Sequence, residues 1–416
     1  MTANVGLQTE ALADQFGTPM VLHPMDCTRL RGRMIATSLV VEPMPLADAF
    51  VLKGLLSQFS ADEALVAAER WPANTADQTH LPSGHRVHFI SSRWTWPKRG
   101  QRFIRWLKWL LIPRTVFRLT KLARKEGCNA ILASFPDEQL LFASYLVARR
   151  LGLRLFPYLH NTYRENRRGV AYAFASWLQQ RVFKRASAVF VMSEGMQQEL
   201  EKLYPGVNFC PLVHTFDQQI PRFEPLPLID RTRVRLGYMG SVNDANLDAL
   251  KRICQMVNAS GNLALNFYSA APDWQLNKEG LVGERIRRER PTDSELVDAL
   301  GNDDLLILPH GLTGGLAPIE YRTIFPTRTI PYLLSRRPIV AYSAQGSFLS
   351  RWLRQHDCAE VVEDPDPAVL RAAIDRLCDD AQRREQLVRN ALVAAEHFGA
   401  DRVVADMKKT INRFLP

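Results

Sequence analysis

The sequence alternates short apolar runs with longer segments of helical spacing, and this alternation constrains the fold more than any other feature. In the first half, the runs that we expect to form buried strands are residues 34–41, 86–91, 130–135, 153–160 and 187–193. Segments with helical spacing separate the last four runs, and one of them, residues 138–152, ends at a glycine. This order predicts a parallel sheet with helices on both faces.

A proline-rich break divides the chain. Residues 217–233 contain three prolines and no periodic pattern, which is typical of a linker. The alternation then restarts, with expected strands at residues 234–241, 263–270, 305–310 and 337–343 and expected helices at 246–257 and 293–301. We therefore expect an α/β protein with two doubly wound, Rossmann-like domains, for which a chain of 416 residues is long enough.

The domain boundaries that we expect follow from these patterns. Residues 1–30 fit no element, residues 31–216 form the first domain, residues 217–232 the linker and residues 233–395 the second domain. The final segment, residues 396–416, continues a helical stretch long enough to return to the first domain.

Positive charge is concentrated in one segment. The formal net charge is +10, with 53 Lys and Arg against 43 Asp and Glu. Eleven of these bases and four tryptophans lie between Arg93 and Lys125, where there is no acidic residue, so the rest of the chain is almost neutral. A local basic segment of this kind indicates a specific anionic surface as partner.

Other composition features exclude several classes. The six cysteines form no CxxC pair, which argues against a disulfide framework or a zinc site. His80, His85 and His88 lie close together, but no carboxylate or cysteine nearby completes a ligand set, and we expect no metal there. No signal-peptide pattern begins the sequence and no apolar run is long enough to span a membrane, so we expect a cytoplasmic protein or one held on the cytoplasmic face of a membrane.

Ligands of doubly wound sheets bind at the carboxyl ends of the strands, so the residues that follow the strands are the candidates for a site. Gly240 and Ser241 follow the first strand of the second half and precede a helix. A glycine turn that leads into a helix presents free N–H groups to an anion such as phosphate. The alternative is an ordinary turn between a strand and a helix.

A second candidate precedes the segment "TIPYLL". Pro331 is tolerated only in the first turn of a helix, so we expect this helix to begin late, with Thr329 as its N-cap. Thr327 and Arg328 then lie in the turn before it, where a hydroxyl, a guanidinium and N–H groups suit a diphosphate. The alternative is a capped helix with Arg328 in solvent.

Three polar residues in the first half are candidates for catalysis. His160 lies at the end of an apolar strand. Asp137 and Glu138 follow another strand and are either a general base or the N-cap and first turn of the next helix.

Four segments together resemble nucleotide-sugar glycosyltransferases of the GT-B fold, and family 4 above all. They begin at Leu153, Ala188, Gly237 and Phe325, and the block from Phe325 to Asp366 is the most specific. The resemblance extends from about Cys128 to Arg389 and is poor before residue 125. It implies two Rossmann-like domains that face a cleft, and transfer of a sugar from a nucleotide-diphospho-sugar to a hydroxyl, with retention and without an obligatory metal.

The resemblance also implies roles for individual residues. Gly240 and Ser241 contact the diphosphate, Thr327 and Arg328 lie near the phosphates and ribose, and His160 lies beside the transferred sugar. Ser193 and Glu194 line the cleft floor, and the base-binding segment is Arg287 to Leu296.

This chain departs from the family pattern at several positions. The family commonly has two glutamates seven residues apart, but here those positions are Thr323 and Pro331. The usual cations of the glycine turn are absent, and Arg322 or Arg328 is the candidate replacement. Arg336 stands where relatives have glycine at a helix end.

Residues 101–112 predict an amphipathic helix. Leucine, isoleucine and aromatic side chains fall on one arc, and the polar side carries Arg102, Arg105, Lys108 and Trp109, with Trp106 on the apolar arc. Cations on one face with aromatic side chains at its edges are typical of a helix that lies in a membrane interface. The alternatives are a helix packed on the first sheet and a single-stranded nucleic-acid groove; the resemblance disfavours nucleic acid, which we do not expect as a partner.

Two functions follow from these observations. The first is a sugar transferase in surface polysaccharide assembly, acting on a lipid-linked or saccharide acceptor at an anionic membrane surface. The second is a non-catalytic membrane-binding or scaffolding protein that kept the fold after it lost the ribose-binding carboxylates.

Overall fold

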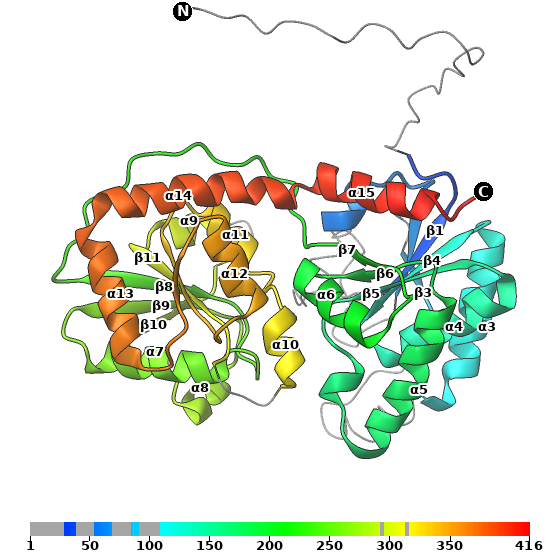
Figure 1. Cartoon of the computed structure of the whole chain (residues 1–416), viewed down its shortest axis with the longest axis horizontal. Coiled ribbons are helices and arrows are strands. Elements are labelled where there is room, and N and C mark those ends of the chain that lie inside the picture. Colours follow the sequence, from blue (N-terminus) through cyan, green and yellow to red (C-terminus); the bar gives the residue numbers. More distant parts are fainter. Residues whose placement is uncertain are drawn as a thin grey trace, which may run out of the picture.

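The computed structural model describes residues 29–38, 54–68, 85, 87–90, 109–135, 137–291, 295–312 and 316–416. Two parallel sheets, each with its own helices, lie side by side and are joined at one side by the last helices of the chain (Figure 1). The α/β class with two doubly wound units is therefore confirmed.

The first sheet has seven parallel strands in the order β3-β2-β1-β4-β5-β6-β7. Its strands are β1 (Met34–Ser38), β2 (Ala64–Ala68), β3 (Val87–Phe89), β4 (Ala130–Phe135), β5 (Arg154–Leu159), β6 (Val189–Val191) and β7 (Phe209–Pro211). Its helices are α3 (Ile112–Lys125), α4 (Glu138–Leu151), η1 (Arg164–Asn166), α5 (Gly169–Arg185) and α6 (Glu194–Leu203). The order of the strands reverses between β1 and β4, which is the topological switch point of this sheet.

The second sheet has six parallel strands in the order β10-β9-β8-β11-β12-β13. Its strands are β8 (Val234–Met239), β9 (Leu263–Tyr268), β10 (Ile286–Glu289), β11 (Leu305–Pro309), β12 (Ile339–Tyr342) and β13 (Glu360–Val362). Its helices are α7 (Leu247–Ala259), α8 (Asp273–Glu279), α9 (Leu296–Gly301), α10 (Pro318–Thr323), α11 (Thr329–Leu334), α12 (Phe348–Gln355), α13 (Pro367–Asp379) and α14 (Ala381–Ala395). This strand order is that of dinucleotide-binding Rossmann folds, with the switch point between β8 and β11.

The last helix covers the first sheet. After α14 the chain runs through η2 (Glu396–Phe398) into α15 (Ala400–Asn412), whose Val404, Met407 and Ile411 are buried against β1, β2 and β4. Figure 1 shows α14 over the second sheet and α15 over the first. Lys408 of α15 forms a buried ion pair with Glu63 (3.1 Å), which fixes this helix to the N-terminal half.

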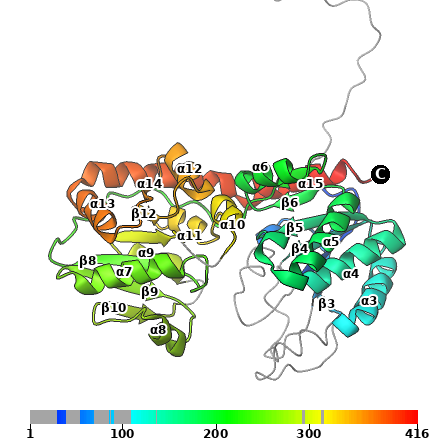
Figure 2. The same cartoon turned by 60° about the horizontal axis from the view of Figure 1, so that its bottom comes forward.

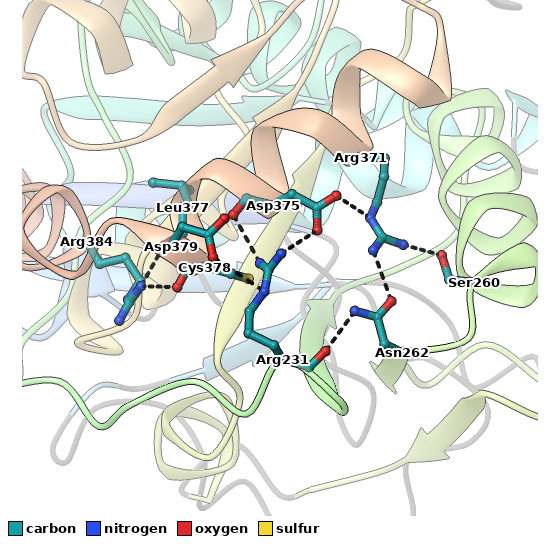
Figure 3. A network of polar contacts seen from close by, with 9 residues as sticks. All are labelled: Arg231, Ser260, Asn262, Arg371, Asp375, Leu377, Cys378, Asp379 and Arg384. Atoms are coloured by element: carbon teal, nitrogen blue, oxygen red, sulfur yellow. Dashed lines mark hydrogen bonds and ion pairs between the residues drawn. The ribbon is translucent and has the colours of Figure 1, made fainter.

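Residues 217–233 contain no helix or strand, and their end is tied to α13 (Figure 3). Arg231 Nη1 donates to the backbone oxygen of Asp375 at 3.1 Å, and Arg371 Nε donates to the carboxylate of the same residue at 2.7 Å. Arg371 also donates to Ser260 Oγ at 2.7 Å and to Asn262 Oδ1 at 3.0 Å. This network ties the segment that leads into β8, and the turn between α7 and β9, to α13.

Among the described residues, none of the helices combines the length and the apolar character needed to cross a bilayer.

Candidate functional site

The glycine turn after β8 and the arginine before α11 meet in space. Gly240 has φ +135°, a conformation that side chains disfavour. A Cβ atom at Gly240 would lie 3.0 Å from both Cζ and Nη1 of Arg328. The two predicted diphosphate residues are therefore neighbours at the switch point of the second sheet.

The position of the Arg328 side chain is set by Tyr238. Arg328 Nη1 donates to Tyr238 Oη at 2.8 Å, and Cζ lies 5.5 Å from the centroid of the same ring. Tyr238 in turn donates to the backbone oxygen of Ser241 at 2.9 Å. The tyrosine thus connects the guanidinium with the glycine turn, and sequence patterns gave no sign of it because a buried tyrosine within a strand is ordinary core.

The remaining predicted residues of this turn lie at its edge. Ser241 is exposed, and its Oγ accepts a hydrogen bond from Asn243 at 3.1 Å. Thr327 is half-buried in the turn before α11. The helix begins at Thr329, one residue earlier than expected, so Arg328 and not Thr329 occupies the N-cap position, without capping the helix through its side chain. The guanidinium is therefore not used as a cap and reaches Tyr238 instead.

Two other donor candidates point away from Gly240. Thr323 Oγ1 donates to the backbone oxygen of Ile319 within α10 at 2.9 Å. Arg322 is exposed and donates to Glu199 of α6, in the other half, at 3.3 Å. The structure thus places Arg328, and not Arg322, beside the glycine turn.

Ser193 and Glu194 lie where α6 begins. Ser193 Oγ accepts from the N–H of Met196 at 3.0 Å as the N-cap of α6, and it donates to the backbone oxygen of Thr323 at 2.6 Å. Glu194 is exposed in the first turn. Ser193 therefore joins the first half, just after β6, to the end of α10 in the second half.

His160 lies buried at the end of β5. Its Nε2 is 3.0 Å from Ser134 Oγ, and its ring stacks on that of His214, with centroids 5.7 Å apart and planes at 12°. Burial and the proximity of His214 hold the pKa of His160 well below its usual value. Burial also lowers the pKa of His214 to about 4. Both rings are therefore neutral at physiological pH, and His160 is suited to hydrogen bonding rather than to carrying charge.

The two acidic candidates already have partners. Asp137 Oδ1 accepts from the N–H groups of Gln139 and Leu140, each at 2.8 Å, so its side chain caps α4. Glu138 accepts from Arg167 Nε at 2.8 Å. This is the arrangement of the N-cap and first turn, the alternative that the sequence left open beside a general base.

Glu320 was not among the predicted residues, yet it is the most buried carboxylate between the two halves in the described part of the chain. It accepts from the N–H of Thr162 at 2.8 Å, from the hydroxyl of the same residue and from Asn166 Nδ2 at 3.2 Å. Asn166 Oδ1 also accepts from the N–H of Ala317 at 3.0 Å. Burial raises the pKa of Glu320 in spite of these donors. The segment "PIEYRT" gave no sequence signal, because the contact depends on how the two halves meet.

The remaining expectations concern metal, base and membrane residues. Among the described residues, no three His, Cys, Asp or Glu side chains gather as metal ligands do. The expected base-binding segment, Arg287 to Leu296, contains most of edge strand β10 and the start of α9, and its residues 292–294 lie outside the described ranges. Arg102, Arg105, Trp106 and Lys108 also lie outside them. Trp109 is half-buried, and its ring packs edge-on against that of Phe174, with centroids 4.9 Å apart.

Residues 78–214 match the sequence model of Glycosyltransferase Family 4. The resemblance to this family is confirmed. The match begins at residue 78, about 50 residues before Cys128, where the sequence patterns predict its start. A search of curated protein sequences gives no match.

Solved structures share the fold across both halves. Sucrose-phosphate synthase from Thermosynechococcus elongatus aligns with a TM-score of 0.68 at 12% identity, over 92% of this chain and 99% of that chain. HepE from Anabaena, in complex with UDP-glucose, aligns with a TM-score of 0.64 at 15% identity, over 92% of this chain and 100% of that chain. A glycosyltransferase from Rickettsia africae gives a TM-score of 0.64 at 10% identity, over 92% of this chain and 99% of that chain. The two halves thus have the arrangement of a GT-B fold.

Proposed function

We propose that this chain, which carries a glycosyltransferase family 4 domain in a GT-B-like fold, moves a sugar from a nucleotide-diphospho-sugar to a hydroxyl of a membrane-presented saccharide or glycolipid. We assign it to the assembly of a surface polysaccharide, with the protein bound peripherally at the inner face of the membrane. The observation that carries the donor part of this proposal is the contact between Arg328 and Gly240 at the switch point of the second sheet.

The donor diphosphate would lie at this contact. Backbone N–H groups of a glycine turn and a guanidinium held by Tyr238 both favour an anion there. HepE, which has the same fold, is described in complex with UDP-glucose, so a uridine diphosphate sugar is the first donor to test. No obligatory metal is needed if Arg328 and the N–H groups stabilise the leaving diphosphate.

We propose that the transfer to the acceptor hydroxyl takes place beside His160. The bond between the anomeric carbon and the diphosphate oxygen breaks, the acceptor oxygen bonds to the same carbon, and the hydroxyl proton passes to the leaving diphosphate. This route retains the configuration and needs no separate base, which fits the involvement of Asp137 and Glu138 in capping and ion pairing. The neutral ring of His160 would orient the transferred sugar by hydrogen bonding.

A second candidate function has one observation in its favour. The two positions at which the family carries glutamates are Thr323, whose hydroxyl is bonded within α10, and Pro331, which has no polar side-chain atom. A fold that lost donor binding would act as a membrane-binding or scaffolding protein.

Nucleotide binding separates the two functions. Thermal unfolding of the purified protein would be followed with UDP, GDP, dTDP, CDP and ADP, in the absence of added metal. A rise in the melting temperature of several degrees with one nucleotide supports the transferase and identifies the base. If none of the five nucleotides raises the melting temperature, the transferase is rejected in favour of the scaffold.

A further inference from the structure

The N-terminal half carries a set of exposed apolar side chains at two helices, α3 and α5, that both pack against α4. In the described part of the chain, twelve large hydrophobic side chains are exposed, and half of them lie at α3 and α5. These six are Leu110, Leu111, Phe117, Val170, Tyr172 and Trp177. Val170, in the first turn of α5, is 88% exposed. Such a cluster marks an interaction surface.

Aromatic contacts connect the region before α3 with α4 and α5. The rings of Trp109 and Phe174 lie 4.9 Å apart, and those of Phe142 and Trp177 lie 5.8 Å apart. Trp109 lies three residues before α3 and Phe142 belongs to α4. These contacts therefore connect the segment before α3 with the first half of α5, with α4 between them. Figure 2 shows α3, α4 and α5 as neighbours on the outer side of the first sheet.

The same surface is cationic and has no acidic residue on either helix. The sequence of α3 contains five Lys and Arg, that of α5 contains three, and neither contains Asp or Glu. Arg114, Phe117, Lys121 and Arg124 follow one another at spacings of three and four residues, so cations and an exposed aromatic ring share one face of α3. On α5, the guanidinium of Arg181 lies 4.8 Å from the centroid of the Trp177 ring.

This combination fits an anionic bilayer. Aromatic and aliphatic side chains enter the boundary between headgroups and acyl chains, and the surrounding Lys and Arg contact lipid phosphates. The sequence before α3 contains six further Lys and Arg between Arg93 and Lys108, which lie outside the described residues and are not counted as part of this surface. We infer that the α3–α5 surface, defined by the six exposed apolar residues and the cations of the two helices, docks on an anionic lipid membrane.

The surface borders the residues at which we propose sugar transfer. Arg164 Cζ lies 5.9 Å from the centroid of the Tyr172 ring, and Arg164 begins η1. Asn166, at the end of η1, is bonded to Glu320. One short 3-10 turn thus separates the α3–α5 surface from the contact between the two halves.

A substrate class follows, and this part rests on the proposed function. A site that lies this close to the bilayer takes an acceptor whose reactive hydroxyl is near the headgroups, such as a lipid that carries one or a few sugars. A long polysaccharide end far from the membrane, or a free oligosaccharide, does not need this surface.

The test is co-sedimentation with vesicles of phosphatidylglycerol and phosphatidylcholine in equal parts, and with vesicles of phosphatidylcholine alone. The full chain should bind the anionic vesicles only. The double variant Phe117→Glu and Val170→Glu should bind them at least tenfold more weakly, because both side chains are exposed and contribute to the apolar part of the surface. A matched control, Leu228→Glu and Val393→Glu, changes two exposed apolar side chains away from this surface, one in the linker and one in α14, and should bind as the wild type does.

Equal vesicle binding by the wild type and the Phe117/Val170 variant overturns the inference. So does wild-type binding to a single-stranded oligonucleotide without binding to vesicles. The melting temperature with and without UDP is measured in the same samples. If the Phe117/Val170 variant loses vesicle binding but keeps the UDP-induced rise in melting temperature, the α3–α5 surface is supported independently of the donor site. If the wild type binds vesicles but shows no such rise with UDP, the transferase is rejected and the docking surface remains supported.

Discussion

The guanidinium of Arg328 lies against the backbone of Gly240, so that a Cβ atom there would be 3.0 Å from its Cζ and Nη1 atoms. Two residues far apart in the sequence of the second half thus form one surface at the end of β8. The relationship requires glycine for two reasons: the positive φ of the turn and the space that the guanidinium fills.

Gly240→Ala is therefore expected to damage both the turn and the anion site. The left-handed backbone costs about 1–3 kcal/mol with a side chain. The methyl group would lie 3.0 Å from the guanidinium of Arg328, which must shift by a few tenths of an ångström. Urea denaturation should show a loss of stability of this size, and the UDP-induced rise in melting temperature should disappear. Gly261→Ala is the control, because a Cβ at Gly261 meets nothing within 4 Å. An unchanged UDP shift in Gly240→Ala contradicts the assignment of the phosphate site.

Arg328→Ala is expected to weaken UDP binding by about ten- to a hundredfold. This range corresponds to the loss of one or two charge-assisted hydrogen bonds. Arg322→Ala removes the other cation that the sequence offered, and because Arg322 pairs with Glu199 it should leave UDP affinity within about twofold of the wild type. Isothermal titration calorimetry of both variants decides between the two arginines, and a larger loss with Arg322→Ala would reverse the assignment.

Glu320→Ala should destabilise the contact between the two halves. The substitution leaves the buried N–H and hydroxyl of Thr162 without their acceptor, at a cost of about 2–3 kcal/mol. Glu199→Ala removes an exposed ion pair across the same contact and should cost less than about 1 kcal/mol. Urea denaturation measures the loss, and limited proteolysis at residues 217–233 reports whether the halves separate. Equal effects of the two variants would contradict the role assigned to Glu320.

Much of the fold could be predicted because the strands of parallel sheets are buried on both faces. Runs such as Leu305–Pro309 are apolar at every position, so they can be recognised as strands without knowing which strands pair with them. β2 has the sequence ALVAA, which composition alone assigns as readily to a helix, and only its burial between β1 and β3 makes it a strand. The edge strand β10 has the sequence IRRE and follows no apolar pattern.

The site could be predicted in part, and for a specific reason. Gly240 and Arg328 could be predicted from local rules about turns and helix starts, because these rules depend only on residues that are adjacent in the sequence. The bond between Glu320 and Thr162 and the stacking of His160 on His214 join distant segments. Neither contact produces a periodic pattern in the sequence, so both could be found only from the three-dimensional structure.

Arg336→Gly is expected to stabilise the protein. The departure from glycine noted in the sequence has a structural counterpart, since Arg336 has φ +58° at the end of α11. Glycine removes a cost of about 1 kcal/mol, and the lost ion pair with the mostly exposed Glu224 offsets little of it. The urea midpoint should rise. Asp357→Gly is the contrasting variant: φ is +45° there too, but the carboxylate accepts from Arg383, Gln386 and Asn390, so the midpoint should fall.

Acid should unfold the protein through its buried histidines. Burial lowers the pKa of His214 and of His310 to about 4, whereas each titrates near 6.5 in the unfolded chain. A depressed pKa in the folded state means that the unfolded state binds protons first, so the stability that neutral histidines contribute is complete above pH 6.5 and is lost as the pH falls toward 4. The loss is on the order of 3 kcal/mol for each histidine.

His214→Phe keeps a ring stacked on His160 and removes one titrating group. The difference in unfolding free energy between pH 7.5 and pH 5 should therefore be smaller in this variant than in the wild type. Equal differences would mean that His214 is protonated in the folded protein and that the stacked pair does not keep His160 neutral.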